Sequence, residues 1–155
     1  VLVEVCRGSV GLEASHEVQC FVQECNFHFN TCGVFVHGGA EPLLLQCQVT
    51  ANKDTGVCVV GPSGGRYEYC KVYDNMGWGF QMYGHGTPYL NSVQITGNTR
   101  GGVEVSTHCN PTVRQSQVTH NLGEAGVWVK DHGRGVWEQC SVSRNSGHGV
   151  LTSAG

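Results

Sequence analysis

The 155-residue sequence contains few charged residues. Asp, Glu, Lys and Arg make up 14% of it, against about 25% in an average soluble domain. No run of Lys or Arg occurs, and the net charge of −3 argues against a surface that binds nucleic acid. No apolar run approaches the roughly 20 residues of a membrane-spanning helix or the length of a signal-peptide core. We therefore expect neither nucleic acid nor membrane as a partner.

The sequence also lacks the motifs of several enzyme classes. It has no C-x-x-C pair, no nucleotide-binding glycine loop and no recognisable Ser–His–Asp set, so the corresponding redox, nucleotide and acyl-transfer chemistries are not supported. No apolar pattern of helical period is long enough for the crossover helix of a βαβ unit. We expect no cofactor.

The sequence does contain a repeat of 22 to 24 residues. Each glycine of the repeat is followed by an apolar residue, and the position 14 residues later is Cys, Val or Ser. All length variation falls between the asparagine and the next glycine, so the rest of the repeat keeps a fixed register, as stacked strands require. The asparagines stand at intervals of 22, 23, 23, 23 and 24 residues, at Asn30, Asn52, Asn75, Asn98, Asn121 and Asn145.

Within each repeat, apolar and polar residues alternate over three to five positions, as in Gln48-Val49-Thr50. This period of 2 predicts short β-strands, and a repeat of about 23 residues with two or three such strands predicts a coil of parallel strands. Its core should consist of stacked Val, Ile, Leu, Phe and Cys columns. The 23 glycines should occupy turn positions that need a positive φ.

The pattern resembles the right-handed parallel β-helix of the pectate-lyase-like superfamily. More narrowly, it resembles the P-x-L-x-x-C-x-V-x-x-N-x-x-x-x-G-V-x-V repeats of eukaryotic β-helix F-box proteins, and Pro42-Leu43-Leu44, Pro88-Tyr89-Leu90 and Pro111-Thr112-Val113 fill the P-x-L part. The resemblance implies an all-β, right-handed parallel β-helix of about seven coils. Membership of the F-box group would imply substrate recognition for ubiquitin ligation, although the 155 residues contain no F-box.

Nine cysteines are present, an odd number, and Cys25, Cys47 and Cys70 fall in one inward column on consecutive coils, with Cys140 further along it. Three adjacent thiols leave one unpaired whichever disulfide forms, which favours reduced thiols and an intracellular, cytoplasmic location. The sequence begins without Met and ends mid-pattern without a cap. We expect one domain over residues 1–155, as a segment of a longer protein.

The outward face of the Cys-x-Val strand is a candidate binding surface. Its amides, hydroxyls and ring could bind a glycan or an extended peptide, or the face could simply be solvated. The candidate residues are Gln48, Lys71, Gln94, Gln117, Thr50, Tyr73, Thr96 and Thr119. The Asn30 to Asn145 column, by contrast, is expected to be a structural ladder of side-chain amides at the turn.

The two polar columns of this face contain no Asp or Glu. Glycosidases need a carboxylate pair. The resemblance to pectate lyases implies a Ca²⁺ ion, which clustered acidic side chains would have to hold. Gly84-His85-Gly86 resembles the G-H-G motif of polygalacturonases, but the Asp motifs that accompany it in that family are absent. We therefore expect no catalytic residues in this segment.

Three smaller features complete the prediction. His85, His108 and His132 each follow their glycine by six residues, so they should stack as an ordinary turn ladder, with a shared Zn²⁺ as a weaker alternative. Arg100 and Glu124 occupy equivalent positions on adjacent coils and should form a surface ion pair.

The exposed aromatic side chains Phe35 and Trp128 should point outward, where a partner or missing parts of the protein would cover them. Together these features predict a non-catalytic β-helical scaffold that binds a protein partner or the rest of a larger chain. The alternative is a carbohydrate-binding or polysaccharide-active β-helix.

Overall fold

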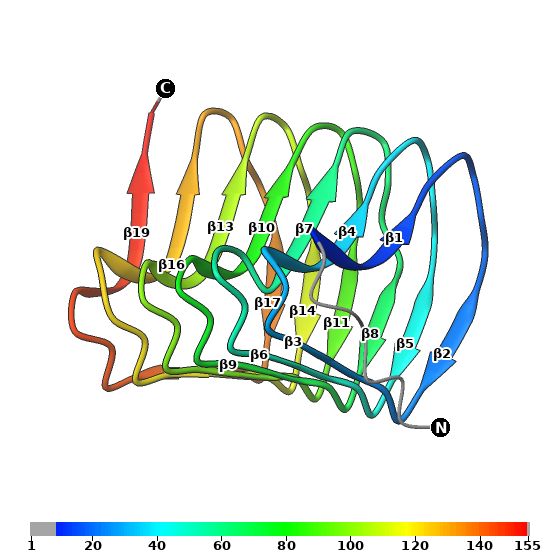
Figure 1. Ribbon diagram of the computed structural model, residues 1–155. Coiled ribbons are helices and arrows are strands. Elements are labelled where there is room, and N and C mark those ends of the chain that lie inside the picture. The colour runs from blue at the N-terminus through cyan, green and yellow to red at the C-terminus, as the bar shows by residue number, and fades with distance from the viewer. Residues whose placement is uncertain (1–8, 155) are drawn as a thin grey trace.

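The computed structural model describes residues 9–154, which form 19 β-strands and no helix. The strands wind into a three-sided rod, with the first strand, β1 (Val10–Ala14), and the last, β19 (His148–Ser153), at opposite ends of the stack (Figure 1). Among the described residues, no helix is long and apolar enough to cross a membrane. The expected domain also includes residues 1–8, with Cys6, and Gly155, which lie outside the described residues.

Each side of the rod is one parallel sheet (Figure 1). Sheet A contains β1 (Val10–Ala14), β4 (Cys32–Val36), β7 (Val57–Val60), β10 (Trp78–Tyr83), β13 (Gly101–Ser106), β16 (Ala125–Lys130) and β19 (His148–Ser153). Sheet B contains β2 (Phe21–Gln23), β5 (Leu43–Leu45), β8 (Arg66–Glu68), β11 (Tyr89–Asn91), β14 (Thr112–Arg114) and β17 (Val136–Glu138). Sheet C contains β3 (Asn26–His28), β6 (Gln48–Thr50), β9 (Lys71–Tyr73), β12 (Gln94–Thr96), β15 (Gln117–Thr119) and β18 (Ser141–Ser143).

One coil consists of a strand from sheet B, then one from sheet C, then one from sheet A. The described residues make six such coils, from β2 to β19, preceded by the single strand β1. The predicted parallel β-helix is therefore confirmed, and the expected number of about seven coils differs only slightly. The register follows the repeat, since Phe80 pairs with Val57 on one side and Val103 on the other.

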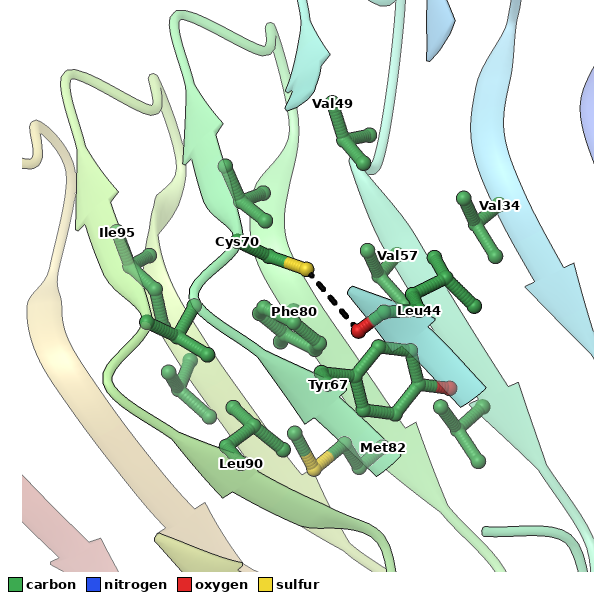
Figure 2. Close-up of a cluster of buried hydrophobic side chains, with 14 of the residues drawn as sticks. Val34, Leu44, Val49, Val57, Tyr67, Cys70, Phe80, Met82, Leu90 and Ile95 are labelled. Carbon is green, nitrogen blue, oxygen red and sulfur yellow. Dashed lines mark hydrogen bonds between the residues drawn. The ribbon is translucent and has the colours of Figure 1, made fainter. Parts of the chain in front are cut away.

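The core is a set of columns that run along the inside of the rod. Val57, Phe80 and Val103 are buried in one of them, and Figure 2 shows Phe80 among residues of all three sheets. The ring of Tyr67 meets Phe80 edge-on, with centroids 5.3 Å apart, and its hydroxyl donates to the carbonyl of Gly64. The predicted apolar columns are thus confirmed.

The predicted asparagine ladder is present at the corner between sheets C and A, which we call the Asn corner. Oδ1 of Asn75 accepts from the backbone N–H and from Nδ2 of Asn52, at 3.1 and 2.8 Å. Nδ2 of Asn75 donates to Oδ1 of Asn98 and to the carbonyl of Val49. Every donor and acceptor of this buried amide is therefore used. Oδ1 of Asn30, on the first rung, has no donor among the described residues.

The glycines of the repeat have a different role from the one expected. Gly56 does not have a positive φ, but a Cβ there would lie 2.7 Å from Cγ1 of Val72 and 2.8 Å from Nδ2 of Asn75. The repeat therefore needs glycine for close packing beside the ladder. Nine other described glycines, such as Gly97, do have the predicted positive φ. Positive φ values also occur at non-glycine corner residues such as Tyr69 and Asp74. That conformation is unfavourable by about 1–2 kcal/mol per residue, so the stacked coils must impose it.

Candidate functional site

The two polar columns predicted on sheet C assemble on its outward face, which we call the polar face. In each of its four central strands the first residue is exposed, the second buried and the third half-buried. The columns stack in register and contain Gln48, Lys71, Gln94 and Gln117, and Thr50, Tyr73, Thr96 and Thr119. The hydroxyl of Tyr73 donates to Oε1 of Gln48 at 3.0 Å. That this flat array of amides and hydroxyls binds a ligand stays a prediction.

Large apolar side chains are exposed at the Asn corner, next to the polar face. Phe29, Met76 and Leu122 are 60%, 64% and 48% exposed. Phe29 directly precedes Asn30 of the ladder, whereas Met76 and Leu122 directly follow Asn75 and Asn121. The three stand on every second coil, so they are spaced at about 10 Å along the rod, given about 4.8 Å between strands. The sequence pattern did not reveal them, because Met76 and Leu122 fall in the turn of variable length between asparagine and glycine, and Phe29 lies just before that turn.

The outward face of sheet A is more covered than predicted. The ring of Phe35 stacks on that of His37, with centroids 4.6 Å apart. Trp128 carries the ammonium of Lys130 over its ring at 4.3 Å and donates from Nε1 to Oγ of Ser153. Phe35 and Trp128 do point outward, but each is half-buried. Side chains of the same chain provide part of that cover.

A pocket of about 390 Å³ opens on this face, and we call it the indole pocket. It is lined by Trp78, Thr99, Arg100, Glu104, Gly123, Glu124, Trp128 and Lys130. The indoles of Trp78 and Trp128 have centroids 6.3 Å apart. Glu104 is 7% exposed, and its Oε1 accepts from Nε2 of Gln81 at 3.3 Å and lies 3.6 Å from Nζ of Lys130. The pocket thus combines an aromatic wall with ordered charged groups.

The ion pair predicted between Arg100 and Glu124 is wrong. The structure places both side chains at the rim of the indole pocket, but neither forms an ion pair with any described residue. Equivalent positions on adjacent coils bring two backbones close, yet they do not decide where two long exposed side chains point. Both charged groups therefore remain available to a ligand.

Sheet B carries a second, more open hollow. Its volume is about 640 Å³, and it is lined by Tyr89, Asn91, Arg114, Gln115, Glu138 and Gln139. Two ion pairs lie on this sheet, one between Arg114 of β14 and Glu138 of β17 and one within β8, between Arg66 and Glu68. The two glutamates share one column, three coils apart, which is about 14 Å. That separation exceeds the range of about 5–9.5 Å found for glycosidase carboxylate pairs.

His85, His108 and His132 stack as predicted, on three consecutive turns between sheets A and B. Neighbouring rings are within 6° of parallel, with centroids 5.2 and 5.1 Å apart. Ring-nitrogen lone pairs lie in the ring plane, so parallel stacked rings direct them side by side and not toward one ion. Within residues 9–154, no group of three or more His, Cys, Asp or Glu is arranged to hold a metal. The stack thus has the geometry of a turn ladder.

The thiols have environments set mainly by burial. Burial raises the pKa of Cys58 and of Cys109 to about 11. Cys47 differs, because its interaction with the neighbouring Cys70 thiol lowers its pKa. A reactive thiolate must also be accessible, whereas Cys47 is buried at the corner between sheets B and C. Its role is therefore structural.

A family model described as "Right handed beta helix region" matches residues 8–155. No curated protein matches the sequence. Among solved structures, the chain is similar to pectate lyase Pel9A, with a TM-score of 0.58 and 15% sequence identity. The match covers 77% of this chain and 41% of that chain, so this chain spans less than half the length of its structural neighbour. These matches support the wider β-helix fold and lend nothing to the narrower resemblance to F-box proteins.

Proposed function

Because this chain belongs to the family of right-handed β-helix regions, we propose that it serves as a non-catalytic scaffold that binds a protein partner. The partner is another protein or another part of a longer chain that contains this domain. The observation that carries the proposal is the row of exposed apolar side chains at the Asn corner, Phe29, Met76 and Leu122. Aromatic residues and Met are enriched in protein interfaces relative to the rest of the surface.

The corner offers these side chains on a rigid support. Asn75 and Asn121, which directly precede Met76 and Leu122, are buried and hydrogen-bonded to the rungs on either side. A support that does not have to become ordered on binding reduces the entropy lost in association. Met76 and Leu122 share one column and lie about 10 Å apart along the rod, and Phe29 lies in the neighbouring column two coils before Met76. This arrangement suits an extended or helical segment that lies parallel to the rod axis.

The polar face borders this row and supplies the polar rim that such interfaces have. Lys71, Gln94 and Gln117 are exposed there and can pair with polar groups of the partner. The separation of Glu68 and Glu138 supports the non-catalytic part of the proposal. These two carboxylates share a column on sheet B but lie about 14 Å apart, which is too far for a glycosidase pair.

A peptide library displayed on phage tests this function and requires no identified partner. Peptides selected on the wild-type chain should be rich in apolar residues and should lose binding to the triple variant Phe29→Ser, Met76→Ser, Leu122→Ser. The matched control is Lys53→Ser, Arg144→Ser, which changes exposed residues of the same corner and should retain binding. Peptides that bind the triple variant as well as the wild type would contradict the proposal.

Carbohydrate binding is the second candidate function, and it is favoured by the regular amide and hydroxyl columns of the polar face. A polymer rich in hydroxyl groups could pair with Gln48, Gln94 and Gln117, which repeat in register. A polysaccharide in an affinity gel should then retard the wild-type chain and should not retard the variant Gln94→Ala, Gln117→Ala. Equal mobility of both proteins in every gel would contradict this candidate.

We also propose that the domain works inside the cell, in a reducing compartment. Cys47, Cys70 and Cys140 are free thiols although they share one column. Alkylation of the natural protein without reductant, followed by peptide mass analysis, should find these three residues alkylated. Disulfide-linked peptides that contain two of them would contradict the location.

A further inference from the structure

The indole pocket on sheet A has a shape that the strands alone do not explain. Sheet A has small residues at Gly101 and Ala125, in the column where the preceding coil has Trp78. A Cβ at Gly101 would lie 2.2 Å from Cζ3 of Trp78, so the indole packs closely against that glycine. Trp128 stands in the next outward column. Trp78, which is 5% exposed, and Trp128 thus both line a hollow on this sheet.

The polar groups of the pocket fall into two sets. Glu104 is nearly buried and is held by Gln81 and Lys130, so its carboxylate has a fixed position. Arg100 and Glu124 are exposed at the rim and form no ion pair with a described residue. A bound molecule therefore meets one fixed acceptor and, at the rim, one unpaired donor group and one unpaired acceptor group.

This combination matches the chemistry of a sugar ring. A pyranose presents an apolar face of C–H groups that packs on an indole, and its neighbouring hydroxyls act as donors and acceptors at once. A guanidinium and a carboxylate can each bind two neighbouring hydroxyls, and charged partners give the stronger hydrogen bonds. Two cations and two carboxylates line the pocket, so its charges balance and it offers no net attraction to an anionic sugar.

We infer that the indole pocket is a binding site for a neutral glycosyl unit. Its volume of about 390 Å³ lies near the lower end of the roughly 300–1,000 Å³ of ligand pockets, which suits one or two sugar rings. The aromatic wall packs against the ring face, while Arg100 and Glu124 select the arrangement of hydroxyls. The site is on sheet A, apart from the Asn corner and the polar face, so it does not rest on either proposed function.

Titration with neutral sugars tests the site. The probes are methyl glucoside, methyl galactoside, methyl mannoside, N-acetylglucosamine and cello-oligosaccharides, with galacturonate as the anionic comparison. Binding to at least one neutral probe should be saturable in calorimetry and should change the indole emission. Trp137 packs against the core, so the variant Trp137→Phe should keep the response. The variant Trp128→Ala should lose it.

Arg100→Gln provides a second variant that leaves the fold undisturbed, because Arg100 is exposed. It should raise the Kd at least about tenfold, which corresponds to about 1.4 kcal/mol. Arg114→Gln removes an exposed guanidinium on sheet B and should leave the Kd unchanged. Three outcomes would overturn the inference. They are no response to any neutral probe by the folded chain, tighter binding of galacturonate than of methyl galactoside, or an unchanged Kd in both Arg100→Gln and Trp128→Ala.

Discussion

Replacing Asn75 by alanine should destabilise the rod far more than replacing Asn145, although both residues belong to the same ladder. Asn75 is buried in the middle of the stack, whereas Asn145 is half-buried in the last coil. Asn75→Ala leaves two buried donors of Asn52 without a partner, its backbone N–H and one N–H of Nδ2. The carbonyl of Val49 loses a donor as well.

The magnitude follows from the two orphaned donors. Each buried group left without a partner costs about 1–3 kcal/mol, so Asn75→Ala should lower the free energy of unfolding by about 2–6 kcal/mol. For a chain of this size, each kcal/mol lowers the Tm by about 2–4 °C, which gives a fall of about 4–24 °C. In Asn145→Ala, water can reach the exposed end of the ladder and replace the amide, so the loss should be about 1 kcal/mol or less.

Urea denaturation of the three proteins, followed by circular dichroism, measures both losses. The wild type and both variants should unfold with the same dependence on urea, so that the midpoint reports the free energy. Equal losses for the two variants would refute the ladder as the source of the effect. So would a midpoint of Asn75→Ala that is indistinguishable from that of the wild type.

Three further predictions concern the core, the thiols and the histidines. Val103→Asp places a carboxylate at a fully buried position and should abolish the β-sheet circular dichroism signal. Val150→Asp, in the same column but at a position that is 59% exposed, should retain that signal. A folded Val103→Asp variant would refute the register. Burial raises the pKa of Cys109 from 9.0 to about 11, so the contribution of this thiol to stability is complete below pH 9 and is lost between pH 9 and 11, where the unfolded chain alone releases the proton. In Cys109→Ala, the urea midpoint should therefore fall less steeply between pH 9 and 11 than in the wild type. An unchanged slope would contradict this. Addition of Zn²⁺ should not change the Tm, because the rings of His108 and its neighbours stack in parallel; a rise in Tm that His108→Ala abolishes would contradict the turn ladder.

The fold and the inward columns could be predicted from the sequence because the repeat has a constant length outside one turn. An alternation with period 2 then determines which residues face inward, as it did for Val49, Val72 and Val103. The asparagine ladder followed from the same count. These features depend on the register of the backbone, and a repeat reports the register directly.

The corner conformations could not be predicted in this way. Tyr69 and Gln115 have φ values of 54° and 48°, although neither residue favours the left-handed region. The coils above and below each corner impose its backbone conformation. The conformational preference of a single residue cannot predict this effect of tertiary structure. Glycine does occupy some corners, such as Gly97 at the position equivalent to Asp74, but the repeating glycines that precede the apolar column, Gly56 and its equivalents, lie beside the ladder.

The candidate sites were predicted only in part, because they depend on where long side chains lie. The polar face followed from register alone. The indole pocket depends on the indole of Trp78 lying over Gly101 and on Arg100 and Glu124 staying apart, neither of which a periodic pattern contains. The shared column of Glu68 and Glu138 was not predicted. The prediction considered acidic residues in the two polar columns of sheet C, whereas these two carboxylates lie on sheet B.

We propose that the outer surfaces of this rod bind ligands and do not cleave them. The most direct test is to incubate the chain with a panel of neutral and acidic polysaccharides, with and without Ca²⁺, and to measure new chain ends over time. A pectate lyase on its own substrate serves as the positive control. The account predicts no new chain ends in any sample, even where a neutral glycan is bound. Chain ends that accumulate in proportion to the concentration of this protein would contradict it.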